Sequence, residues 1–218
     1  MHAGWHFRRV DCPGEQPEVS RDGRRNPSRL GPPPPGRRAG VVASANLTNL
    51  LAIRDLLACC QARWGRQWPV DLRVAGEVSA LVRTLPPADR RLFAGRHVRL
   101  LGFVPEIDGF YRGIDLALAP VRVGTGINIK MVEALDFGVP VLSTVVGAKG
   151  LPVRDTRHRL LDIEALVAAM EQVAVDPEGL STLAEAGRTA CAQYHSTAES
   201  ALDALLRHEK LSPGNHPI

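Results

Sequence analysis

The chain has 218 residues, of which 44% are hydrophobic and 23% are charged. This balance is typical of a globular protein and argues against a wholly disordered or fibrous chain. No stretch approaches about 18 uninterrupted apolar residues, so the sequence predicts no transmembrane helix. Aromatic residues make up only 5% of the chain, which argues against a stacking platform for single-stranded nucleic acid.

The formal net charge of +4 lies entirely near the N-terminus. Residues 1–40 contain eight arginines and four acidic residues, whereas residues 41–218 contain 19 basic and 19 acidic side chains. Because a nucleic-acid site needs a basic surface on the folded part, we expect no DNA or RNA partner. The four cysteines form no CxxC pair, and no secretory-type apolar segment follows the first basic residues, which predicts reduced thiols and a cytoplasmic location.

The N-terminal segment 1–39 is predicted to be a disordered tail rich in proline and arginine. Residues 1–40 include seven prolines and six glycines, and their few apolar side chains cannot offset the entropy lost on ordering. The run of prolines at 32–35 also fits a polyproline ligand of an SH3-type domain, although a disordered leader is the favoured interpretation. At the other end, residues 211–218 are expected to form a flexible C-terminus.

From Gly40 onward, short apolar runs alternate with segments of helical periodicity. A first helix, ending near Trp64, is expected to be capped by Asn46, Thr48 or Asn49. Strands are predicted at residues 41–43, 71–75, 98–101, 115–119 and 139–143, with a sixth at 159–161. Further helices are predicted at residues 88–94, 106–112, 127–137, 163–174, 178–193 and 197–209. Gly138 is expected to end the helix over 127–137, because glycine commonly terminates helices.

Short apolar strands separated by helices predict a parallel sheet that is covered on both faces. The order of the elements is that of an α/β protein, a single doubly wound Rossmann-like domain over residues 40–210. In such sheets, ligands bind beyond the carboxyl ends of the strands. We therefore expect the binding site among the loops at 102–106, 120–128 and 143–151.

The segment 120–141 carries the clearest chemical signal: a strand end, a loop with Gly124 and Gly126, and then a helix. The glycines let the backbone approach a ligand, and free amides at a helix start attract an anion. Lys130 adds an ammonium group, and Glu133 on the same helix face can accept two hydroxyl hydrogen bonds. This arrangement suits a diphosphate and a ribose diol bound without a metal, since the sequence contains no Asp-x-Asp pair. The alternative is a solvated ion pair beside ordinary turn glycines.

This segment and its surroundings resemble the group 1 glycosyltransferases, the retaining family 4 enzymes of the GT-B fold. The resemblance rests on Gly-Phe-Val-Pro at 102–105, on the run GTGINIKMVEAL at 124–135, on Gly-Val-Pro-Val at 138–141 and on TVVGAKGL at 144–151. It covers residues 40–210, which implies the C-terminal, donor-binding half of a GT-B fold.

The resemblance implies that the chain binds a nucleoside diphosphate sugar. Lys130 corresponds to the lysine that contacts the donor diphosphate, and Glu133 to the glutamate that binds the nucleotide ribose. The glycine loop corresponds to the backbone that faces the donor sugar and phosphate. The donor-binding residues implied in this way are Val104, Pro105, Gly124, Thr125, Gly126, Ile127, Asn128, Lys130 and Glu133.

Particular positions match or depart from the family pattern. Val104 and Pro105 resemble the segment that contacts the nucleotide base, and Asn49 resembles an asparagine that opens the first helix, where a capping role suffices. Thr125 stands where many members have the first of two glutamates, which leaves the identity of the donor sugar open. Asp136 replaces a residue that is usually small, and we expect it to be a surface charge near the end of its helix.

The implied activity is the retaining, metal-independent transfer of a sugar from a nucleoside diphosphate sugar to a hydroxyl acceptor, with neither cofactor nor metal. Members of the family place the acceptor site in a preceding domain, which residues 1–39 cannot supply, so no catalytic residue is assigned. Two alternatives are a non-catalytic nucleotide-sugar-binding module and a truncated remnant that needs a separate acceptor-domain subunit. Sugar nucleotide epimerisation is a less favoured interpretation. Membrane association occurs among relatives but is not indicated by this sequence.

The remaining groups that often carry chemistry are expected to be structural. The seven histidines show no metal-ligand spacing, and no Gly-x-Ser-x-Gly nucleophile motif is present. Cys191 falls at a core position of its helix. The sequence therefore predicts no metal site.

Overall fold

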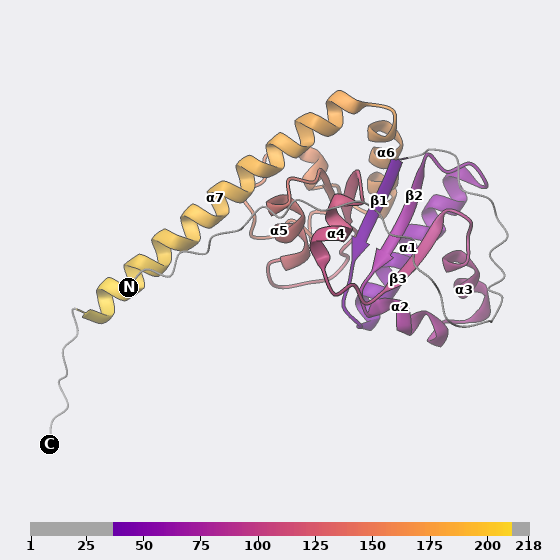
Figure 1. Ribbon diagram of the computed structural model, residues 1–218, viewed down its shortest axis with the longest axis horizontal. Helices are drawn as coiled ribbons and strands as arrows, with labels where there is room; N and C mark the ends of the chain where they lie inside the picture. The colour runs from indigo at the N-terminus through magenta and orange to yellow at the C-terminus, as the bar shows by residue number, and fades with distance from the viewer. Residues whose placement is uncertain (1–36, 211–218) are drawn as a thin grey trace, which may run out of the picture. The chain divides into compact units, whose positions relative to one another are not determined.

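The computed structural model describes residues 37–210. Its five strands form one parallel sheet in the order β3-β2-β1-β4-β5. Figure 1 shows β1, β2 and β3 side by side in this sheet. The strands are β1 (Arg37–Val42), β2 (Val70–Ala75), β3 (Val98–Gly102), β4 (Leu116–Ala119) and β5 (Val141–Ser143). The doubly wound α/β fold predicted from the sequence is confirmed.

Helices connect these strands and follow the last one. They are α1 (Leu47–Trp64), α2 (Val78–Leu81), α3 (Pro87–Phe93), α4 (Ile107–Arg112), α5 (Ile129–Asp136), α6 (Ile163–Ala174) and α7 (Pro177–Lys210). Short 3-10 turns lie at Val82–Thr84 and Thr156–His158. Within the segment that the structure describes, no helix combines the length and the apolar character needed to cross a membrane.

Alternate strand residues face two separate hydrophobic cores, because successive side chains of a strand point to opposite faces of the sheet. One face presents Val41, Leu72 and Leu118 to α1, α6 and the first turns of α7. The opposite face presents Ala117 and Val141 to α4, α5 and the middle of α7. In Figure 1, α7 starts beside α6 and runs past α5, so this helix takes part in both cores.

Two glycines allow backbone segments to meet around the carboxyl ends of β1 and β2. A Cβ atom on Gly40 would lie 2.7 Å from both Phe110 Cζ and Ile114 Cδ1, so α4 packs directly on the strand backbone. Gly76 has a φ of +106°, and a Cβ there would lie 2.1 Å from the carbonyl oxygen of Ala43. Any side chain at Gly76 would push apart the chain segments that follow β1 and β2.

The end of α5 follows the sequence prediction. Gly138 has a φ of +68°, a conformation that glycine adopts without strain. The amides of Gly138 and Val139 donate to the carbonyls of Leu135, at 2.9 Å, and Ala134, at 3.0 Å. These bonds satisfy carbonyls that would otherwise be free at the helix end. The start of α5 lies two residues later than predicted, at Ile129, because Asn128 serves as its cap.

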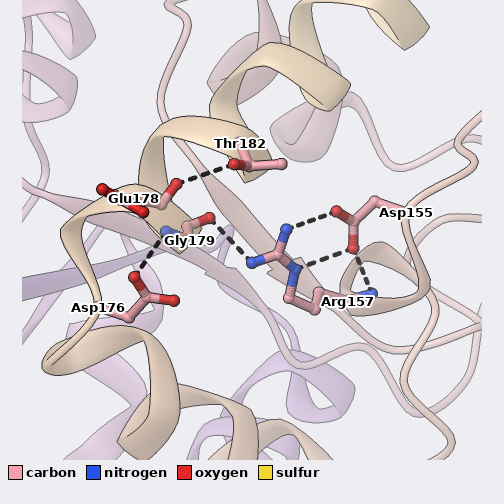
Figure 2. Close-up of polar contacts among 6 residues, drawn as sticks. All are labelled: Asp155, Arg157, Asp176, Glu178, Gly179 and Thr182. Atoms are coloured by element: carbon pink, nitrogen blue, oxygen red, sulfur yellow. Dashed lines mark hydrogen bonds and ion pairs between the residues drawn. The ribbon is translucent and has the colours of Figure 1, made fainter.

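An arginine joins the start of α7 to the segment between β5 and α6 (Figure 2). Asp176 caps α7, accepting a 2.8 Å hydrogen bond from the amide of Gly179. Arg157 Nη1 donates to the carbonyl of Gly179 at 2.9 Å, and its Nη2 donates to Asp155 Oδ2 at 2.6 Å. The hydrogen bond from Arg157 lowers the pKa of the Asp155 carboxyl, although burial opposes this effect. These hydrogen bonds fix the first turn of α7 relative to the segment between β5 and α6.

The last residues of the predicted tail, 37–39, belong to the folded domain. β1 begins at Arg37, inside the segment 1–39 that was expected to be disordered, and pairs with β2 from Val70 onward. Arg37 Nε donates to the carbonyl of Ala174 at 2.8 Å, and the amide of Arg38 donates to a carboxylate oxygen of Asp115 at 2.7 Å. These two hydrogen bonds hold Arg37 and Arg38 in the sheet, although their positive charge was counted with the tail. Residues 1–36 and 211–218, including the proline run, lie outside the described residues.

Three further predictions differ from the structure. The helices expected at 178–193 and 197–209 form one helix, α7, within which Thr197 Oγ1 donates to the carbonyl of Gln193 at 2.8 Å. The sixth strand at 159–161 is reduced to a bridge between Thr144 and Leu160. The short helix α2 was missed, since four residues carry no readable period.

Candidate functional site

A cavity of about 300 Å³ opens beyond the carboxyl ends of β1 and β4. These strands are neighbours in the sheet although β2 and β3 lie between them in the sequence, so the chain reverses its direction of progress across the sheet here. In open parallel sheets, such a switch point is the usual ligand site. The lining includes residues 40–44, Thr48, Asn49, Tyr111, residues 120–122 and residues 127–131.

The first turn of α5 brings a positive group to this cavity. Asn128 Oδ1 accepts a hydrogen bond from the amide of Lys130 at 3.2 Å, and this cap opens the helix at the cavity wall. Lys130 Nζ lies 3.0 and 3.1 Å from the two carboxylate oxygens of Glu133. The Lys130 side chain is 44% exposed, so a ligand can reach its ammonium. Helix dipole and ammonium together favour an anion at this point.

Tyr111 anchors the deeper side of the same helix turn. Its hydroxyl donates to the carbonyl of Lys130 at 3.2 Å and approaches Glu133 Oε2 at 3.5 Å. The ring is buried and stacks on Phe137, with 4.9 Å between the ring centroids. Burial raises the pKa of Tyr111, and the negative charge of Glu133 raises it further. The phenol therefore stays protonated and acts as a donor near neutral pH.

A second helix start borders the cavity across from α5. Asn46 caps α1, with its Oδ1 atom accepting from the amide of Asn49 at 2.8 Å. The capping role considered for Asn49 is wrong: its Nδ2 atom instead donates to the carbonyl oxygen of Ser44, at 3.1 Å, and to Ser44 Oγ, at 3.2 Å. Asn49 thus holds the segment that follows β1, and this segment forms one wall of the cavity.

The loop from β4 to α5 is held at its base and exposed at its tip. The Thr144 hydroxyl donates to the carbonyl of Val121 at 2.5 Å and accepts from the amide of Gly147 at 3.1 Å. At the tip, the exposed Gly124, Thr125 and Gly126 do not line the cavity. A Cβ on Gly126 would meet no atom within 4 Å, and one on Gly124 would meet only side chains at 3.7 Å or more. Packing within the described residues therefore does not require these glycines.

The predicted site residues divide into three groups. Ile127, Asn128 and Lys130 line the cavity, and Glu133 is joined to it through Lys130. The tip of the glycine loop stands outside it. Val104 and Pro105 follow β3, the edge strand, and the structure does not bring them to the cavity.

Several lining residues were missed by sequence reasoning. Arg122 lines the cavity and pairs with Asp55 of α1, while its side chain remains 54% exposed. Ser44 and Tyr111 also line it. Neither carried a signal that sequence reasoning used: Ser44 is brought to the cavity only by the strand order, which places the end of β1 beside β4.

Side chains that could hold a metal gather elsewhere in the described part of the chain. Asp136, Cys191 and His195 bring their ligand atoms within 4.8 Å of one another. None of these three residues lines the cavity. They lie where the C-terminal end of α5 meets α7.

Comparisons with known proteins point to one family. A sequence model described as glycosyl transferases group 1 matches residues 38–206. The lipopolysaccharide core biosynthesis mannosyltransferase LpsB of Rhizobium meliloti (strain 1021) is 35% identical over 94 residues. That match covers 41% of this chain and 24% of LpsB.

Solved structures show the same fold. The Anabaena protein Alr3699/HepE, in a complex with UDP and glucose, matches with a TM-score of 0.60 at 18% identity, over 79% of this chain and 48% of that one. The C-terminal domain of a group 1 family glycosyl transferase (LpcC) from Francisella tularensis matches with a TM-score of 0.56 at 13% identity, over 73% of this chain and 86% of that domain. The chain therefore spans about half of HepE and about a quarter of LpsB.

Proposed function

Because this chain belongs to the group 1 glycosyl transferases, we propose that it is the donor-binding half of a retaining, metal-independent transferase. The donor is a nucleoside diphosphate sugar and the acceptor a hydroxyl group. The observation that carries the proposal is the cavity at the switch point, with the N-terminal end of α5 and Lys130 in its wall. Complexes of HepE with UDP and with UDP-glucose support a nucleotide in this fold. Retention of configuration is taken over from the resemblance to retaining enzymes.

Departure of the diphosphate is the step that these residues would assist. As the bond from the sugar carbon to phosphate oxygen breaks, negative charge develops on the leaving diphosphate. Positive groups that are already in place stabilise such charge most effectively. The amides and dipole of α5, together with Lys130, supply them without a metal ion.

Glu133 would bind the ribose of the same nucleotide. Both of its oxygens now face the Lys130 ammonium. When a diphosphate attracts that ammonium, the carboxylate becomes free to accept from the two ribose hydroxyls. Tyr111 keeps the carboxylate in position during this exchange, because its hydroxyl lies 3.5 Å from Glu133 Oε2.

The loop 124–126 completes the proposed donor site. Its exposed tip has room for a sugar and phosphate to approach the backbone, since the space at Gly126 is open. Val104 and Pro105 can contact the nucleotide base, as proposed, only if the nucleotide extends from the cavity toward the end of β3. The acceptor side of the reaction is assigned to another domain or a separate subunit.

Titration calorimetry with UDP, GDP and ADP tests this proposal directly. Lys130→Ala should weaken binding of the preferred nucleotide about tenfold or more, since hydrogen bonds to charged groups contribute about 1.5–3 kcal/mol. Arg188→Ala is the matched control, because Arg188 forms an i,i+3 ion pair with Glu185 on α7, as Lys130 does with Glu133, and does not line the cavity. Unchanged affinity in Lys130→Ala, or binding of none of the three nucleotides, would refute the donor site.

A second candidate function is a nucleotide-sugar-binding module without catalysis. The start of α5 and Lys130 in the cavity wall suit anion binding, which such a module would share with a transferase. Sugar release from the bound donor by the purified chain, measured as free nucleoside diphosphate over time, separates the two. Turnover by this chain alone contradicts the module.

A further inference from the structure

Three side chains of different chemistry meet where α5 ends against α7. Asp136 is the last residue of α5. Cys191 and His195 lie four residues apart on α7, which places both on the same face of that helix. Cys191 is buried, whereas Asp136 and His195 are about half exposed. The group therefore has a buried sulfur at its base and a rim that opens to solvent.

The distances within this group are those of a compact ligand set. His195 Nε2 lies 2.9 Å from Asp136 Oδ1, and Cys191 Sγ lies 3.0 Å from the same oxygen. All three ligand atoms fall within 4.8 Å of one another. Atoms bound to one tetrahedral metal at about 2.0–2.3 Å lie roughly 3–4 Å apart. Small side-chain adjustments would suffice to place one ion at equal reach of all three.

The alternative is a set of hydrogen bonds without a metal. Cys191 and His195 can each donate to Asp136, which would tie α5 to α7. Hydrogen bonding alone, however, does not require a thiol, which is a weak donor. A thiolate, an imidazole and a carboxylate are together the ligands of zinc, whereas calcium and magnesium select oxygen atoms.

The end of α5 contributes a partial negative charge to the group, although the Arg188 guanidinium also lies near this end. The last carbonyls of α5 carry the negative end of the helix dipole, and they lie beside Asp136. Cys191 Sγ lies 4.0 Å from the carbonyl oxygen of Val132, one turn before Asp136. The group is separated from Lys130 by six residues of α5, or about 9 Å along the helix axis.

We propose that Asp136, Cys191 and His195 form a zinc site that joins the end of α5 to α7. The site has three protein ligands and leaves the fourth position to water from the open rim. It lies outside the proposed donor cavity, which none of its three ligands lines.

Cobalt(II) is the spectroscopic probe, because a thiolate bound to cobalt gives a sulfur-to-metal charge-transfer band. The full chain carrying Cys12→Ser and Cys59→Ser serves as the parent, which removes the thiols at those two positions. Cys60 remains, since it is fully buried in the core on the α1 face. We expect the parent to bind one cobalt ion with the charge-transfer band, and zinc to displace it.

The ligand variants decide the result. Cys191→Ser should abolish the band, and Asp136→Asn and His195→Ala should each weaken zinc binding at least about tenfold, the minimum loss seen even for partners outside the ligand set. Asp203→Asn, on an exposed turn of the same helix, should have no effect. Zinc should also raise the melting temperature of the parent but not of Cys191→Ser.

Two results would overturn the site. One is a parent that binds no cobalt, or binds it without the charge-transfer band. The other is zinc affinity that stays the same in Asp136→Asn, a variant that keeps the size and one hydrogen-bonding oxygen of the side chain. Circular dichroism of each variant shows that it is folded, so loss of binding is not confused with loss of structure.

Discussion

Tyr111 shows how one buried phenol can organise a binding surface made of partly exposed side chains. Lys130 and Glu133 are both partly exposed, so their ion pair alone contributes little fixed geometry. The tyrosine ring is locked by burial and by stacking on Phe137. Its hydroxyl then gives the carboxylate and the helix backbone a fixed reference point. A positioning role for Tyr111 follows from these contacts.

Tyr111→Phe tests that role. The variant keeps the ring and its packing but removes the hydroxyl, so Glu133 loses a fixed neighbour. We expect UDP affinity to fall about two- to tenfold, which corresponds to about 0.5–1.5 kcal/mol for one neutral hydrogen bond. Tyr194→Phe, on α7 and outside the cavity, is the control. Unchanged affinity in Tyr111→Phe would show that Glu133 is positioned without it.

At the scale of elements, α5 has both of its ends specified by single residues. Asn128 caps the start, and Gly138 reverses the chain just beyond the end. The glycine was predicted correctly from the sequence, since only the local pattern of apolar residues and a following strand was needed. The exact start was not, because Ile127 and Ile129 are equally apolar and the cap is decided by which side chain reaches the first amides.

Gly138→Ala should destabilise the protein by about 1–2 kcal/mol, because an alanine in the left-handed conformation brings its Cβ close to the backbone. The free energy of unfolding from urea titration measures this loss. Gly109→Ala is a suitable control: Gly109 lies inside α4, and its added Cβ would meet no atom within 4 Å. That change should be neutral or stabilising, since alanine favours helix more than glycine does. Equal losses in both variants would contradict the argument from φ.

The long helix α7 shows where local signals fail. Separate helices were predicted at 178–193 and 197–209, and Ser196 and Thr197, at this break, are residue types that often cap helices. In the structure, their neighbourhood stays helical: besides the bond from Thr197, Ser200 Oγ donates to the carbonyl of Ser196 at 2.8 Å. A hydroxyl can either begin a helix or bond within one. No glycine or proline stands between 188 and 210, so nothing in this stretch interrupts the helix.

At the scale of the whole described domain, the response to pH depends on a buried imidazole. His158 is fully buried, and neither of its ring nitrogens has a hydrogen-bond partner among the described residues. Burial lowers its pKa; the nearby Asp155 opposes this shift and Arg157 adds to it. Below about pH 6.5, the unfolded chain protonates this ring while the folded protein keeps it neutral. The free energy of unfolding should therefore fall as the pH falls from about 6.5 toward the lowered folded-state pKa.

His158→Gln should flatten that dependence. Urea titrations at about pH 7.5 and about pH 5 give the free energy of unfolding of each protein. We expect the wild type to lose more stability than the variant between these values, by up to about 1.4 kcal/mol per pH unit in the affected range. Asp155 does not affect the comparison. Because its pKa is lowered, its contribution to the free energy of unfolding is lost only at more acidic pH. Equal losses in both proteins would rule out His158 as the cause.

The candidate site could be predicted only as far as it is local in sequence. The run from Gly124 to Glu133 predicts a helix start that carries an ammonium and a carboxylate. The structure brings Asn128 and Lys130 of this run to the cavity. The wall formed by Ser44 depends on the strand order, which apolar runs do not encode. The group of Asp136, Cys191 and His195 was also missed, since Asp136 is far in sequence from the other two and meets them only through the packing of α7 on α5.

The shortness of α5 gives it a mechanical property. A helix of eight residues is about 12 Å long and is short enough to act as one rigid unit. Its front end faces the cavity, and its rear end is gripped by α7. Any shift that a bound nucleotide imposes on the front would be felt at the rear, and by thermodynamic reciprocity a molecule or ion that clamps the rear would alter nucleotide affinity by the same factor.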